Sequence, residues 1–148
     1  MTGCMTMTRV LLIPFLLTAC GQGSGSRVPG DSSDTQPFSG IAESEELQLT
    51  GTEPFWGGSV KGGTLTYTTP ENIVGTAITV ERFAGRGGLS FSGELGGEKL
   101  DVMVSPGECS DGMSDRTFPF TVTLRICEEE RRGCGWSSKH PFTEDEAS

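Results

Sequence analysis

Two short segments of this chain gather side chains that could bind a ligand. The first, Gly51–Gly57, places Glu53, a proline and the aromatic pair Phe55 and Trp56 within a few residues. An exposed tryptophan is a common binding anchor because it offers a large contact area at low entropic cost. The alternative is structural: Phe55 and Trp56 would plug the end of a β-barrel while Glu53 accepts hydrogen bonds from nearby backbone amides. A small β core needs such plugs, which favours the structural interpretation.

The second segment, Cys109–Asp115, surrounds one glycine with hydroxyl and carboxylate oxygens, from Ser110, Asp111, Ser114 and Asp115. Oxygen ligands of this kind suit calcium. The segment lacks the regular alternation of acidic residues in calcium loops, however, and an Asx turn explains the same residues without a ligand. We therefore predict no metal ion and no cofactor here. Arg86 lies between glycines and could flank an anion-binding nest of backbone amides, although a β-turn is the default there.

Candidates for catalysis are few. His140 is the only histidine of the chain, and a Ser-His-Asp arrangement would require it to reach the serines of Cys109–Asp115. A carboxylate pair formed by Glu53 with Asp111 or Asp115 could act in acid–base chemistry. Nothing in the spacing brings these groups together, so we predict a protein that is not an enzyme.

The N-terminus predicts export and lipidation. One basic residue, Arg9, precedes the apolar run Val10–Leu17, which is too short to cross a bilayer but has the length of a signal-peptide core. The following Leu17-Thr-Ala-Cys20 resembles a bacterial lipobox. Residues 1–19 are thus predicted to be removed and Cys20 to carry the lipid. Because glycine follows Cys20, we expect an outer-membrane lipoprotein whose domain faces the periplasm.

The remaining chain is predicted to form one domain on a tether. Residues 20–40 contain the lipidated cysteine and a flexible linker, 41–142 a folded β domain, and 143–148 a disordered acidic tail. The net charge of −9 argues against nucleic acid as a partner and favours a cationic one. An acidic surface that only keeps the domain soluble is the alternative.

Short segments of alternating hydrophobicity predict an all-β domain, a small antiparallel β-barrel or sandwich of about seven to eight strands. The dipeptides Gly62-Gly63 and Gly96-Gly97 suit hairpin turns, and Pro119 predicts an edge or a bulge. The segments are 47–50, 58–61, 64–69, 76–83, 89–95, 99–104 and 118–126.

Three cysteines of the domain require an explanation. We predict a disulfide between Cys109 and Cys134, which would tie the loop after Val104 to the end of the sheet. The alternative is Cys127–Cys134, a local hairpin staple. A zinc site that combines the three cysteines with His140 lacks the usual ligand spacing.

A resemblance rests on four segments, Gly51–Trp56, Leu65–Pro70, Cys109–Asp115 and Gly133–Cys134. With these, the chain from about Leu49 to Trp136 resembles a family of uncharacterised proteobacterial lipoproteins. It is more loosely similar to META-type lipoproteins and to membrane-bound inhibitors of c-type lysozyme. The family resemblance implies a small envelope β-barrel, supports the Cys109–Cys134 bridge and implies no established activity. Cys127 departs from the family pattern, in which glycine is more usual, and its redox state and partner stay open.

These features predict a lipid-anchored envelope protein that acts as a non-catalytic binding module. Its partner would be a cationic protein or a peptidoglycan-related ligand, engaged through the surface near Glu53–Trp56 and Ser110–Asp115. One alternative is a structural or envelope-stress lipoprotein in which the same motifs only hold the barrel closed. A carboxylate-based enzyme is the third hypothesis.

Overall fold

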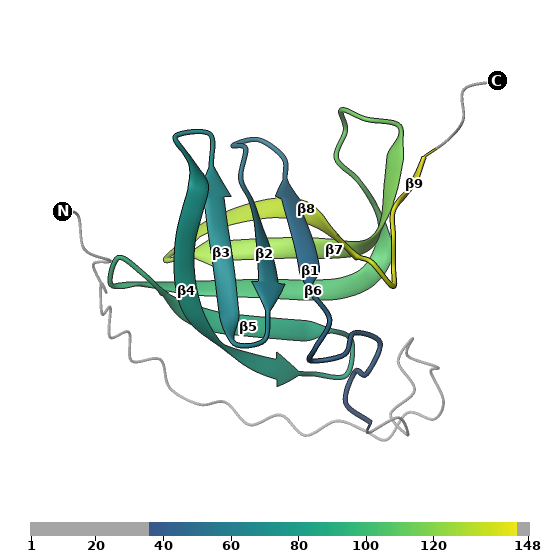
Figure 1. Cartoon of the computed structure of the whole chain (residues 1–148), viewed down its shortest axis with the longest axis horizontal. Coiled ribbons are helices and arrows are strands. Elements are labelled where there is room, and N and C mark those ends of the chain that lie inside the picture. Colours follow the sequence, from purple (N-terminus) through teal and green to yellow (C-terminus); the bar gives the residue numbers. More distant parts are fainter. Residues whose placement is uncertain (1–35, 145–148) are drawn as a thin grey trace, which may run out of the picture.

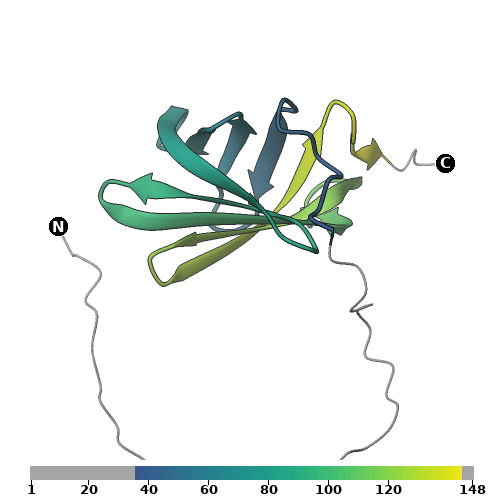
Figure 2. The same cartoon turned by 90° about the horizontal axis from the view of Figure 1, so that it is seen from below.

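The computed structural model describes residues 36–144, which fold into a β-barrel (Figures 1 and 2). The predicted signal peptide, Cys20 and most of the predicted linker lie outside these residues. Within them, no helix is long or apolar enough to cross a membrane. The strands are β1 Leu47–Gly51, β2 Gly57–Lys61, β3 Thr64–Thr69, β4 Asn72–Ala84, β5 Leu89–Leu95, β6 Glu98–Ser110, β7 Arg116–Ile126, β8 Glu129–Ser137 and β9 Thr143–Glu144.

The barrel is an antiparallel meander that closes on itself. Each strand from β1 to β8 pairs with the next one, and β8 returns to β1 with Gly51 opposite Gly133 and Leu47 opposite Ser137. Closure pairs β8 with β1, so neither of these two strands is left as an edge of an open meander. β1–β4 run across the direction of β5–β8 in Figure 1. The predicted all-β barrel is confirmed, and so are the glycine hairpin turns.

The core follows the predicted alternation. Ile78 and Val80 of β4 are buried, whereas Phe83 on the other face is 68% exposed. One inward face per strand gives a single apolar cluster, as expected for a strand with one solvated face. Its members are Ile41, Leu47, Leu49, Trp56, Val60, Leu65, Tyr67, Ile78, Val80, Leu89, Phe91, Leu100, Val102, Val104, Phe120, Val122 and Leu124.

β8 is the strand that periodicity does not predict. Its first half is charged, and the inward positions of its buried second half are Gly133, Gly135 and Ser137 instead of large apolar residues. The glycine positions are required by close packing. A β-carbon added at Gly133 would lie 2.3 Å from the Thr50 carbonyl oxygen. A strand built from small residues gives no alternating hydrophobic signal, although it closes the barrel.

The β6–β7 hairpin extends beyond the barrel and is bulged. The register between the two strands shifts between Pro106 and Cys109, opposite Pro119, which confirms the predicted bulge. Cys109 and Cys134 form the predicted disulfide, with their α-carbons 5.6 Å apart. Cys127 lies in the β7–β8 turn at φ 54°, a conformation that favours glycine.

Both boundaries of the domain differ slightly from the prediction. Phe38, assigned to the linker, donates its amide to the Gly85 carbonyl at 2.7 Å and packs against the core. Thr143 and Glu144, assigned to the disordered tail, form β9 against β7. The side chain of Glu144 also forms an ion pair with Arg116 at 2.6 Å.

Candidate binding site at the open end of the barrel

The β1–β2 loop is anchored on one backbone carbonyl. The carbonyl oxygen of Arg132, on β8, accepts the amide of Thr52 at 3.1 Å and the indole N–H of Trp56 at 3.3 Å. The Gly51 amide donates to the Trp56 carbonyl at 2.7 Å and closes the base of the loop. These hydrogen bonds hold the backbone of the β1–β2 loop in one conformation, and that conformation determines where the side chains between its two ends point.

The two aromatics of this loop lie in different environments. Trp56 is 5% exposed and belongs to the core, where its indole occupies the space left by two glycines. A β-carbon at Gly51 would lie 2.0 Å from the indole nitrogen. Phe55 is 46% exposed and points out of the barrel. The structural interpretation therefore holds for Trp56 and fails for Phe55, and no hydrogen bond within the described residues ties Glu53 to the backbone.

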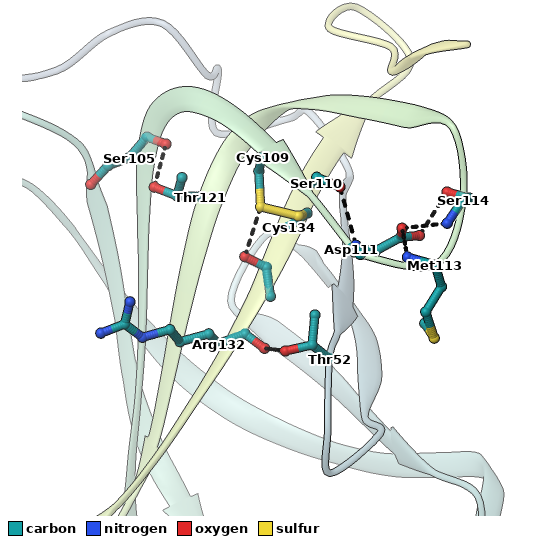
Figure 3. The surroundings of a disulfide bond; sticks show 12 residues. Thr52, Ser105, Cys109, Ser110, Asp111, Met113, Ser114, Thr121, Arg132 and Cys134 are labelled. Carbon is teal, nitrogen blue, oxygen red and sulfur yellow. Dashed lines mark hydrogen bonds between the residues drawn. A yellow bond between two sulfur atoms is a disulfide. The ribbon is translucent and has the colours of Figure 1, made fainter. Parts of the chain in front are cut away.

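The β6–β7 loop is an Asx turn. Asp111 accepts the amides of Met113 at 2.9 Å and Ser114 at 2.8 Å, and the Ser114 hydroxyl at 2.8 Å (Figure 3). The two backbone bonds hold the pKa of the Asp111 carboxyl below its usual range. Its oxygens are therefore used within the loop, as the structural alternative for this segment requires. The Met113 side chain projects out of the loop and is 64% exposed.

The disulfide and the fixed loops bring the two segments to one end of the barrel. We call this the open end. It carries the β1–β2 loop and the β3–β4 turn, and the β6–β7 loop lies beside them along the upper side of Figure 1. Met113 lines the same depression as Phe55 and Trp56, although their positions in the chain are far apart. The sequence singled out both segments, but only the fold shows that they meet.

The depression beside Met113, here the outer groove, has a volume of about 380 Å³. Thr50, Gly57 and Thr68 lie opposite one another on β1, β2 and β3 and form its floor. Its apolar sides come from exposed residues of three separate loops or hairpins, namely Phe55, Met113 and Ile73, the last of which is 81% exposed. Exposed apolar side chains that converge on one hollow indicate an interaction site more strongly than scattered ones do.

A second hollow, here the barrel mouth, shares Phe55 with the outer groove as a lining residue and has a volume of about 710 Å³. Tyr67 lies within it, and its hydroxyl accepts a hydrogen bond from Arg131 at 2.9 Å. Burial raises the pKa of Tyr67. Arg131 also donates to Glu129 at 2.8 Å, so its charge is already balanced.

The rim of the barrel mouth is acidic. Glu53 and Glu71 line it, and neither makes an ion pair with any described residue. With Arg131 paired, this rim carries uncompensated negative charge beside an exposed phenylalanine. Such a surface favours a ligand that is cationic and partly apolar.

The other predicted site residues do not join this surface. Arg86 lies on the exposed β4–β5 turn, where the Gly85 amide bonds the Gly88 carbonyl, at the opposite end of β4 from Ile73. Ser110 accepts the Gly112 amide at 3.1 Å. Ser114 is held by Asp111, and Asp115 is exposed in the same loop without lining either hollow.

Sequence reasoning missed Ile73, Met113, Glu71, Tyr67 and Arg131. Met113 lies inside the segment Cys109–Asp115, which sequence reasoning singles out for its oxygen ligands and not for an apolar side chain. Ile73 follows Pro70-Glu71-Asn72, which reads as an ordinary turn. The available signal was an isoleucine next to a valine immediately after a turn, since large apolar side chains rarely have a structural use there.

A second polar cluster lies at the other end of β1, here the closed end, with residues 41–46 and 137–142. The Glu45 side chain is 2% exposed and accepts hydrogen bonds from the Ser137 hydroxyl and, at 3.3 Å, the Ala42 amide. His140 Nδ1 lies 3.0 Å from the same carboxylate. Burial raises the pKa of Glu45, but the hydrogen bonds from Ser137 and His140 outweigh this effect, so the pKa lies below its usual range.

This cluster is not arranged for nucleophilic catalysis. Ser137 is 1% exposed, and its hydroxyl lies 3.4 Å from His140 Nδ1, the nitrogen that also faces Glu45. In a Ser-His-acid triad the serine and the carboxylate contact different ring nitrogens. The cluster instead joins the segment before β1 to the segment after β8. Among the described residues it is also the only place where a charged side chain is buried.

Comparison with known protein families, with characterised proteins and with solved structures finds no match. Within residues 36–144, no group of histidine, cysteine and acidic side chains is arranged to hold a metal ion.

Proposed function

We propose that this protein is a lipid-anchored envelope module, held by Cys20, that binds a cationic protein or cell-wall component at the open end of its barrel. It does so without catalysis. The observation that carries the proposal is the position of Phe55. This exposed aromatic lines both an apolar groove and a hollow with an acidic rim, and the β1–β2 loop and the β3–β4 turn contribute to both hollows.

Electrostatics supports a cationic partner. The chain has a net charge of −9, and the Glu53 and Glu71 carboxylates line the barrel mouth without an ion-pair partner among the described residues, because Arg131 of the same hollow is paired with Glu129. An acidic rim increases the rate of encounter with basic ligands, and this contribution weakens as salt is added. A barrel that served structure alone would have no need to expose three large apolar side chains around one groove.

The proposal is tested by removing charge at the rim. Glu53→Gln combined with Glu71→Gln should weaken binding of the full-length chain to a c-type lysozyme and to poly-lysine by about tenfold at low salt. Binding is measured by isothermal titration at two salt concentrations, and the variant should also show a smaller dependence on salt.

A matched control makes the same change of charge elsewhere. Glu94→Gln with Glu98→Gln, beside the β5–β6 turn, alters residues that line neither hollow. This control should retain most of the affinity. Equal losses in the two double variants would show that only net charge matters. No binding of either cationic probe by the wild-type chain would contradict the proposed function.

A further inference from the structure

The structure assigns a partner to the open end: we infer that it binds an extended segment of a basic protein, with an apolar side chain in the outer groove and a neighbouring lysine or arginine at the acidic rim. This inference rests on the proposed function, and it narrows the cationic partner to a protein segment.

The lining of the outer groove favours an apolar side chain over a sugar. Its sides are phenylalanine, isoleucine and methionine, and the polar atoms on its floor are threonine hydroxyls and backbone groups. Carbohydrate ligands need several directional polar partners, and the groove has no amide, carboxylate or guanidinium side chain among its lining residues. Methionine is flexible and polarisable, which suits surfaces that accept different apolar side chains.

The acidic rim determines which side chain the ligand carries next to its apolar residue. Phe55 lines both hollows, so a ligand that fills the groove and contacts this ring lies next to the acidic rim. Glu53 precedes Phe55 by two residues, and Glu71 lies across the barrel mouth on the β3–β4 turn. A cationic side chain that follows the apolar one would approach both carboxylates. Arg131 and Glu129 already neutralise one another, so they do not oppose this approach.

The shape of the site also fits an extended backbone. Thr69 and Pro70 line both hollows as well, so the groove and the mouth form one continuous surface over the β3–β4 turn. β4 pairs with β5 only from Val80 onward, so Asn72–Thr79 pairs with β3 alone. The side of Asn72–Thr79 that faces away from β3 is therefore a free backbone edge, to which an extended segment that passes over the β3–β4 turn can bond.

The test compares two short peptides of equal charge, one alternating lysine with phenylalanine and one alternating lysine with glycine. Fluorescence anisotropy with the full-length chain should show the phenylalanine peptide binding at least about tenfold more tightly, because it alone can bury an apolar ring. Phe55→Ala and, separately, Met113→Ala should reduce this preference to about twofold or less. Phe83→Ala, which removes a phenylalanine that is even more exposed (68% against 46% for Phe55) from the far part of β4, should preserve it.

The outcomes separate this inference from the proposed function. If both peptides bind equally and lose affinity in the Glu53 and Glu71 double variant, the proposed function stands and the inference fails. A soluble peptidoglycan fragment provides the second test. If it binds the wild-type chain but not Phe55→Ala, and if it competes with neither peptide, the partner is a cell-wall component and the inference is overturned. If the cationic proteins and both peptides all fail to bind, both statements are contradicted. Melting curves for each variant exclude loss of fold as the cause.

Discussion

Glu45 and Glu53 lie near opposite ends of β1, and their surroundings differ in every respect that matters for function. Glu45 is buried, and its carboxylate is used by a serine, a histidine and a backbone amide that tie the two ends of the domain together. Glu53 is exposed, has no described ion-pair partner, and lies beside an exposed aromatic. The carboxylate at the closed end is therefore used to hold the fold together, whereas the one at the open end is left without a partner among the described residues.

The same contrast holds within the open end. Trp56 and Phe55 are adjacent, yet one completes the core and the other projects from it. The difference has a local cause. The Arg132 carbonyl accepts a hydrogen bond from the indole N–H, and Gly51 and Gly133 leave the space that the ring occupies. A motif of conspicuous residues can therefore hold a structural residue and a functional candidate side by side, and burial distinguishes them.

The largest expected effect separates these two aromatics. Trp56→Ala should lower the free energy of unfolding by about 4 kcal/mol because it empties a buried site. Phe55→Ala should lower it by less than about 1 kcal/mol and instead weaken binding of cationic probes. Chemical denaturation and titration calorimetry on the same samples check both. A large loss of stability in Phe55→Ala would make that ring part of the core.

The disulfide should contribute somewhat less. Replacing Cys109 and Cys134 together with alanine releases a loop of 25 residues, and should cost about 3 kcal/mol. Because the bridge positions the loop that carries Met113, the preference for apolar peptides should weaken as well. Thermal denaturation with and without reductant measures the first effect. An unchanged peptide preference in the double variant would show that Met113 needs no bridge.

The closed end predicts a dependence on pH. The pKa of Glu45 is lowered in the folded state, so its contribution to stability is fully present above the ordinary pKa of a glutamate and is lost as the pH falls through the lowered pKa. Glu45→Gln should cost about 2 kcal/mol at neutral pH and less in acid. Urea denaturation across this pH range measures it, with Glu53→Gln as the control. A wild-type profile unchanged by Glu45→Gln would contradict the structural role of this carboxylate.

The smallest effect concerns the β6–β7 loop. Asp111→Asn keeps an oxygen that can accept the Met113 and Ser114 amides, so stability should change by less than about 0.5 kcal/mol, whereas Asp111→Ala should cost about 1 kcal/mol. Differential scanning calorimetry of the two variants checks the order. Calcium should raise the melting temperature of neither the wild type nor the variants, since the carboxylate is engaged within its own loop.

The sequence predicts this fold well where each strand hides one face. The alternation in Leu65–Tyr67 or Phe118–Leu124 marks inward positions directly, and paired glycines mark the hairpins. The alternation does not predict β8, because its inward positions are Gly133, Gly135 and Ser137. Its pairing follows from barrel closure and not from a hydrophobic pattern.

The site is predictable only in part. Glu53 and Phe55 are visible as an unusual motif, but Ile73 and Met113 acquire meaning only when the β3–β4 turn and the β6–β7 loop reach the same groove. Glu45 and His140 are 95 residues apart, and no local pattern links them. Contacts of this kind depend on strand register and on the disulfide, which a single sequence does not encode locally.

Binding at the open end is tested most directly by mapping which residues of the folded protein contact a cationic, apolar peptide. Amide NMR spectra recorded during titration with the lysine–phenylalanine peptide should show shifts at Thr52–Trp56, at Glu71–Val74 and at Met113. Signals of Ile41–Glu45 and Ser137–Phe142 should stay in place. Shifts confined to the closed end, or spread evenly over the acidic surface, would contradict the assignment of binding to the open end.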